Sequence, residues 1–146
     1  MDEAAFRAAR GDANPQPCVF EKALAAGCAR CATSVRRALA ERETIGCASP
    51  PARANCATLA ALIRERAAFA LRLPPGAPLP HAIAMRLSCG GLDGLRQCVD
   101  PDEPDVHRLV AAAQAKCGSL LDLPWPDLVV AVMAWPGRRG HSGRRP

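Results

Sequence analysis

Two stretches decide the predicted fold: residues 19–43, VFEKALAAGCARCATSVRRALAERE, and residues 49–73, SPPARANCATLAALIRERAAFALRL. In the first stretch, apolar and cysteine residues recur at steps of three and four: Leu24, Cys28, Cys31, Val35 and Leu39. Residues at these steps share one face of a helix. The spacing therefore predicts a single helix over about 19–43.

The second stretch carries signals for both ends of a helix. Ser49 can cap a helix, and Pro50 fits the first helical position, where no backbone donor is needed. Pro74 and Pro75 end the helix that these residues begin. We expect helices over about 19–43 and 50–73 to form an antiparallel hairpin. The predicted fold class is all-α, a small irregular helical bundle built on this long hairpin with shorter C-terminal helices.

Length and composition agree with one helical domain. The chain has 146 residues, 49% of them hydrophobic, with 3% aromatic residues and no Tyr. A core poor in aromatic residues favours close-packed helices over sheets. The excess of Ala, and of Arg over Lys, is typical of a GC-rich bacterial genome. We predict a flexible leader over 1–17, a helical cysteine-rich domain over 18–136 and a disordered basic tail over 137–146.

The distribution of charge argues against a nucleic-acid protein. The formal net charge is +5, but four arginines lie within the last nine residues, so the rest of the chain is nearly neutral. A nucleic-acid groove carries its charge within the domain, together with stacking aromatic residues. No apolar run approaches the roughly 18 residues of a membrane span, and the first ten residues lack an export signal. We therefore expect a cytoplasmic protein.

Cysteine is the distinctive residue of this chain. Eight cysteines occur in 146 residues: Cys18, Cys28, Cys31, Cys47, Cys56, Cys89, Cys98 and Cys117. In a secreted protein this number would predict disulfides, whereas in a reducing cytosol it favours metal binding or redox chemistry.

The spacing of four cysteines suggests a set of metal ligands. Eight residues separate Cys47 from Cys56, and eight separate Cys89 from Cys98. The first cysteine of each pair has a glycine beside it, which lets backbone N–H groups approach a sulfur closely. We predict a site of Cys47, Cys56 and Cys89, with Cys98 or Cys31 as the fourth ligand.

The preferred cofactor for this site is a four-iron iron–sulfur cluster, with zinc as the alternative. Four cysteine thiolates can hold either group. Structural zinc usually stabilises folds that lack a core, and this chain has enough apolar residues to build one. The spacing matches neither the close cysteine run of ferredoxins nor the paired cysteines of zinc ribbons.

Two other interpretations of the cysteines remain open. Cys28 and Cys31 form a Cys-x-x-Cys pair, which places both sulfurs on one face of a helix and could act as a redox pair. Free cysteine is also a common small buried residue, so the thiols could be inert.

The predicted function follows from the cofactor. We expect a small iron–sulfur protein that transfers electrons or assists a larger redox enzyme, which would be its protein partner. The alternatives are a helical interaction module with buried cysteines and a thiol redox switch at Cys28 and Cys31. No phosphate loop, nucleophile elbow or zinc-protease motif marks an enzyme, so no catalytic residue is assigned. The sequence leaves the oligomeric state open.

Overall fold

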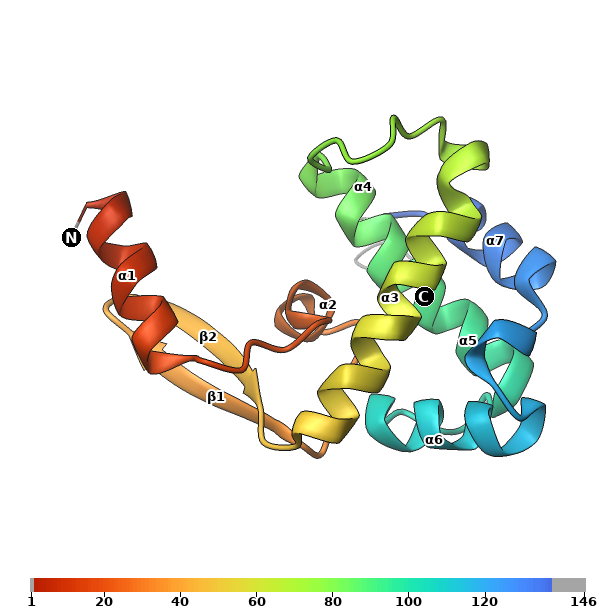
Figure 1. Cartoon of the computed structure of the whole chain (residues 1–146), viewed down its shortest axis with the longest axis horizontal. Coiled ribbons are helices and arrows are strands. Elements are labelled where there is room, and N and C mark those ends of the chain that lie inside the picture. Colours follow the sequence, from red (N-terminus) through yellow and green to blue (C-terminus); the bar gives the residue numbers. More distant parts are fainter. Residues whose placement is uncertain (1, 138–146) are drawn as a thin grey trace.

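The computed structural model describes residues 2–137, which form a β-hairpin with one helix beside it and a larger group of helices (Figure 1). The elements are α1 Glu3–Ala13, α2 Glu21–Ala26, β1 Ser34–Leu39, β2 Arg42–Cys47, α3 Pro50–Leu71, α4 His81–Met85, η1 Arg86–Gly90, α5 Gly91–Val99, α6 Val106–Cys117, η2 Leu120–Asp122 and α7 Trp125–Ala134. The element η1 is a π-helix and η2 is a 3₁₀-helix. The predicted tail lies largely outside the described residues.

The predictions of an all-α fold and of a long helix hairpin are wrong. The stretch 19–43 forms only the short helix α2, which ends at Gly27, and then turns into β1. Gly27 has φ +83°, and a glycine in this left-handed conformation stops a helix. The face that the three- and four-residue steps predicted is therefore divided between a helix, a loop and a strand.

The β-hairpin occupies the place of the predicted helix end and loop. Strands β1 and β2 pair in antiparallel order from Ser34↔Cys47 to Leu39↔Arg42. The turn begins at Ala40, whose φ of 57° is the positive value that a two-residue hairpin turn requires. Ile45 is 1% exposed, so β2 supplies the buried face of this small sheet.

Helix α3 forms where the second stretch predicted a helix, and it runs through the centre of the molecule (Figure 1). Its first turn is capped by Ser49, whose side chain accepts a hydrogen bond from the backbone N–H of Ala52 at 3.3 Å. Helix α7 packs on both α3 and α5. Fully buried leucines fill the space between α3, α5, α6 and α7: Leu59, Leu92, Leu95, Leu109 and Leu128.

Glycines allow η1 and α5 to lie unusually close to their neighbours. A Cβ at Gly90 would come within 2.9 Å of the Cα of Val132, and one at Gly94 within 2.8 Å of the Cβ of Ala131. Both contacts are shorter than van der Waals packing allows. The Gly-rich sequence after Cys89 is therefore needed for helix packing.

Helix α1 lies along the hairpin (Figure 1). Glu3 forms an ion pair with Arg42 at 3.5 Å, and the side chain of the buried Asn14 donates to the carbonyl of Ile45 at 3.1 Å. None of the helices in the described part of the chain has the length and apolarity needed to cross a bilayer. The division of the chain into leader, domain and tail stays a prediction.

Candidate functional site

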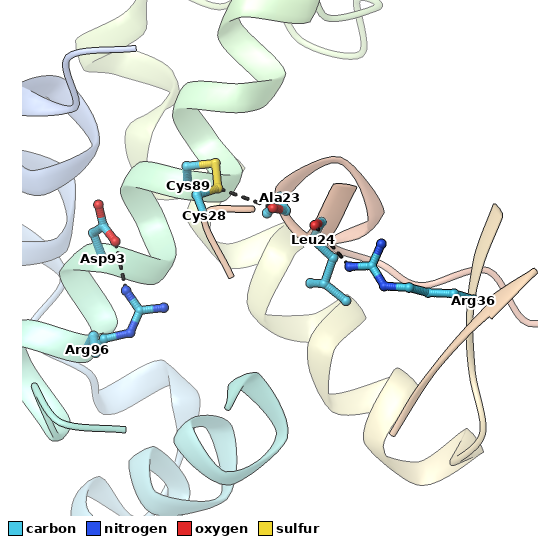
Figure 2. Close-up of a disulfide and its surroundings, with 7 residues drawn as sticks. All are labelled: Ala23, Leu24, Cys28, Arg36, Cys89, Asp93 and Arg96. Carbon is cyan, nitrogen blue, oxygen red and sulfur yellow. Dashed lines mark hydrogen bonds and ion pairs between the residues drawn. A yellow bond between two sulfur atoms is a disulfide. The ribbon is translucent and has the colours of Figure 1, made fainter. Parts of the chain in front are cut away.

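One pair of cysteines is covalently joined. Cys28, just after α2, forms a disulfide with Cys89 in η1, across 61 positions of sequence (Figure 2). Cys89 has no exposed surface, and the Cys28 sulfur lies 3.4 Å from the carbonyl oxygen of Ala23. The bond fastens the segment that leads to the hairpin onto the helical core.

Four of the remaining cysteines line one small apolar cavity. The six free cysteines are Cys18, Cys31, Cys47, Cys56, Cys98 and Cys117. The first four come from four separate segments and border a cavity of about 20 Å³. This volume has room for little more than one water molecule. We call this arrangement of Cys18, Cys31, Cys47 and Cys56 the four-thiol pocket.

Backbone pairing brings Cys18 beside Cys47. The segment before α2 runs along the free edge of β2, where Pro17 and Gly46 form an antiparallel bridge. The N–H of Cys18 donates to the carbonyl of Ile45 at 2.9 Å, and the N–H of Cys47 donates to that of Gln16 at 2.8 Å. The two cysteines therefore lie diagonally across the Pro17–Gly46 bridge, Cys18 opposite Ile45 and Cys47 opposite Gln16.

Gly46 makes this pairing possible. A Cβ at this position would collide with the side-chain oxygen of Asn14 and would lie 3.2 Å from the carbonyl oxygen of Gln16. The glycine beside Cys47 thus admits the segment that carries Cys18.

Asp105 holds the loop that carries Cys31. Its carboxylate accepts a hydrogen bond from the N–H of Ala32 and, at 2.9 Å, one from the N–H of Arg108, so it also caps α6. The N–H of Val106 donates to the carbonyl of Arg30 at 2.9 Å. Asp105 is 9% exposed, and it ties the Cys31 loop to the start of α6.

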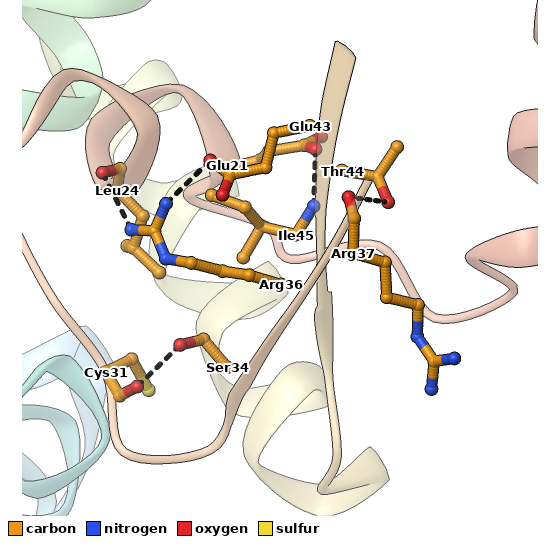
Figure 3. Close-up of polar contacts among 9 residues, drawn as sticks. All are labelled: Glu21, Leu24, Cys31, Ser34, Arg36, Arg37, Glu43, Thr44 and Ile45. Atoms are coloured by element: carbon orange, nitrogen blue, oxygen red, sulfur yellow. Dashed lines mark hydrogen bonds and ion pairs between the residues drawn. The ribbon is translucent and has the colours of Figure 1, made fainter. Parts of the chain in front are cut away.

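The Cys31 loop is also fixed to the hairpin. The hydroxyl of Ser34 donates to the carbonyl of Cys31 at 2.7 Å (Figure 3). The hydroxyl oxygen of Thr33 lies 3.2 Å from the Cys31 sulfur and 3.7 Å from the Cys47 sulfur. Since one oxygen contacts both, these two sulfurs lie within about 7 Å of each other.

Helix α3 supplies the fourth thiol, Cys56, from its second turn. The side chain of Arg53, one turn earlier, donates from Nε to the carbonyl of Pro17 at 2.7 Å. This bond joins α3 to the segment that carries Cys18. The thiol of Cys47 donates to the carbonyl of Ser49 at 3.3 Å, just before the helix begins.

Burial and the neighbouring thiols raise the pKa of Cys18 and of Cys56, so these two thiols stay protonated at neutral pH. Burial, followed by the neighbouring Cys31, Cys18 and Cys47 in that order, raises the pKa of Cys56 from 9.0 to about 12. Cys56 therefore lies within electrostatic range of the other three pocket cysteines.

The pKa of Cys18 is raised to about 11, first by burial. The backbone hydrogen bond of Phe20 opposes this rise, while Cys31, Cys47 and Glu21 add to it. Thiols with raised pKa values, here those of Cys18 and Cys56, are poor nucleophiles at neutral pH. A bound metal cation would lower the pKa of the thiols that bind it, because a coordinated thiol is deprotonated.

The sulfurs are not arranged around a single ion. Among residues 2–137, no three His, Cys, Asp or Glu side chains form a group that could hold one metal ion. A zinc ion needs its four sulfurs at about 2.3 Å from the metal. The four thiols of the pocket therefore do not form a zinc tetrahedron in the described part of the chain.

The structure brings together some of the cysteines that the sequence selected and separates others. Cys31, Cys47 and Cys56 meet at the pocket. Cys89 is bonded to Cys28. The two cysteines of the Cys-x-x-Cys pair are therefore separated, with Cys28 in the disulfide and Cys31 at the pocket. Cys98 does not line the pocket. Burial raises the pKa of its thiol, and the charge of Asp127 raises it by a smaller amount.

Sequence reasoning did not select Cys18, which completes the pocket. It adjoins the predicted leader, and its edge pairing with β2 follows from a strand that the sequence analysis read as a helix end and a loop. His107, in the first turn of α6, also borders the cavity.

Comparison of the chain with protein-family models, curated proteins and solved structures finds no significant match.

Proposed function

We propose that the four-thiol pocket binds an iron–sulfur cluster and that the protein transfers electrons or assists a larger redox enzyme. The observation that carries this proposal is the convergence of four thiols, from four segments, on one cavity. Cysteine thiolates are the standard ligands of such clusters. Here Cys18 replaces Cys89 in the set of ligands, because the Cys89 sulfur is already bonded.

The spacing of the thiols favours a cluster over a zinc ion. A cluster of several irons holds its ligands farther apart than a single tetrahedral ion does. Cys18, Cys31 and Cys47 lie outside the helices, on a loop or at the end of a strand. Only Cys56 is fixed within a helix.

Exposure of the pocket is compatible with electron transfer. Each of its four cysteines is partly exposed, so a bound cluster would lie close to the surface. The surrounding side chains are mostly apolar. Limited access of water and the low local polarity are factors that tune the potential of a cluster.

Anaerobic reconstitution with iron and sulfide tests the proposal. We expect an absorbance band at about 400 nm, with iron and inorganic sulfide in equal amounts. Replacing any pocket cysteine by Ser should reduce the bound iron, whereas the matched variants Cys98→Ser and Cys117→Ser should keep it. Equal losses in both groups of variants, or no bound iron, would refute the proposed site.

A second candidate function is thiol–disulfide chemistry, which the bond between Cys28 and Cys89 favours. A dithiol reductant would be oxidised to its disulfide as the two cysteine thiols form. The free-thiol count should then rise from six to eight on reduction and return on oxidation. Structural disulfides persist in oxidising compartments, so the cytoplasmic location stays a prediction.

A further inference from the structure

A groove of about 420 Å³ opens between the start of α2, helix α3 and the α4–η1 segment. Its walls are mainly apolar: Val19, Ala60, Ile63, Leu79, Ala84 and Leu87. Pockets for small molecules have volumes of about 300–1,000 Å³ and mostly apolar walls with a few polar groups. The groove therefore has the size and lining of a ligand site.

Two cations border the groove, Lys22 from α2 and Arg64 from α3. The ammonium of Lys22 lies 3.4 Å from Nδ1 of His81, and the guanidinium of Arg64 donates to the carbonyl of Ala77 at 2.6 Å. Among the ion pairs between described residues, neither cation has a carboxylate partner.

The one carboxylate in the lining belongs to Glu21, and it is directed to the hairpin. It accepts a hydrogen bond from the N–H of Ile45 at 2.9 Å (Figure 3). The charges left to face the groove are therefore positive.

We propose that this groove binds a small organic anion with an apolar body, of the class of medium-chain carboxylates. The apolar walls would cover the chain of the ligand, and Lys22 with Arg64 would pair with its carboxylate. Two cations among mainly apolar walls match an amphipathic anion better than a neutral apolar molecule.

The groove shares one wall with the four-thiol pocket. Cys18 lines both cavities, so a bound anion would lie directly beside the proposed cluster. The lining that would bind the anion does not depend on a metal, and binding can be measured with the metal-free protein.

Binding of decanoate, measured by calorimetry with decanol as the uncharged probe, tests the proposal. We expect saturable binding of decanoate at one site per chain and weaker binding of decanol. Lys22→Gln and Arg64→Gln should each weaken decanoate binding by about two- to fivefold, as for half-exposed ion pairs. Arg37→Gln, an exposed strand residue away from the groove, should leave binding unchanged.

A second pair of variants tests the location. Ala61 lines the groove and is exposed on α3, so Ala61→Phe should fill the space and abolish binding without disturbing the core. Ala70→Phe places the same side chain at another exposed position of α3 and should preserve binding. No decanoate binding, equal affinity for decanol, or equal effects of the two Phe variants would overturn the proposal.

Discussion

Replacement of Asp105 by Ala removes two hydrogen bonds that hold the Cys31 loop and α6 together. Loss of the helix cap at Arg108 costs about 1 kcal/mol. Loss of the carboxylate bond to the Ala32 N–H costs about another 1 kcal/mol, since Ala32 is exposed and water can replace its partner. We therefore expect a decrease of about 2 kcal/mol in the free energy of unfolding.

Equilibrium urea unfolding, followed by circular dichroism, measures this decrease. With a urea dependence of about 2 kcal/mol per M, the midpoint should fall by about 1 M. Asp105→Asn retains one acceptor oxygen and should lose about half as much. Asp102→Ala is the matched control, because Asp102 is exposed and its change should stay within about 0.5 kcal/mol.

The same variants test whether Asp105 positions Cys31. In the folded protein, Asp105→Ala should make the Cys31 thiol react faster with an alkylating reagent, because its loop retains only the bond between Val106 and Arg30 and its contacts to the hairpin. An unchanged urea midpoint would refute the energetic argument. A shifted midpoint with an unchanged alkylation rate would refute the positioning role.

Three further predictions concern stability. The raised pKa values of Cys18 and Cys56 stabilise the metal-free protein below about pH 9 and lose this effect as pH rises towards 11–12; a urea midpoint that stays constant over this range would contradict the assignment. Reduction of the disulfide between Cys28 and Cys89 should lower the free energy of unfolding by up to about 4 kcal/mol, given the 61-residue separation, and Cys28→Ser should remove this response to reductant. Gly94→Ala should cost about 1–3 kcal/mol through overpacking, whereas the open helical position Gly11 should tolerate Ala; equal effects would refute the close approach of α5 and α7.

Local signals were sufficient to predict some elements and not others. Ser49, Pro50 and Pro74 set the limits of α3, because capping and loss of a backbone donor act within a few residues. In the stretch 19–43, Gly27 carried the missing signal, since a glycine in the left-handed conformation ends α2. The three- and four-residue spacing was present in the sequence but did not determine one helix.

The candidate site depends on pairing between distant segments, which the sequence could not supply. The wrong helix hairpin placed Cys47 and Cys56 near one end, and in the fold both border the pocket. Cys18 reaches the pocket only through its edge pairing with β2. Cys89 was selected for its spacing and its glycine neighbour, but that glycine serves the packing of η1 against α7.

Differential alkylation of the reconstituted protein, read by mass spectrometry, tests the four-thiol pocket most directly. Before removal of the metal, the reagent should modify Cys98 and Cys117 and leave the pocket thiols unmodified. After chelation and unfolding, four further thiols should become reactive: Cys18, Cys31, Cys47 and Cys56. Protection of a different set of cysteines, or the same labelling with and without metal, would contradict the account.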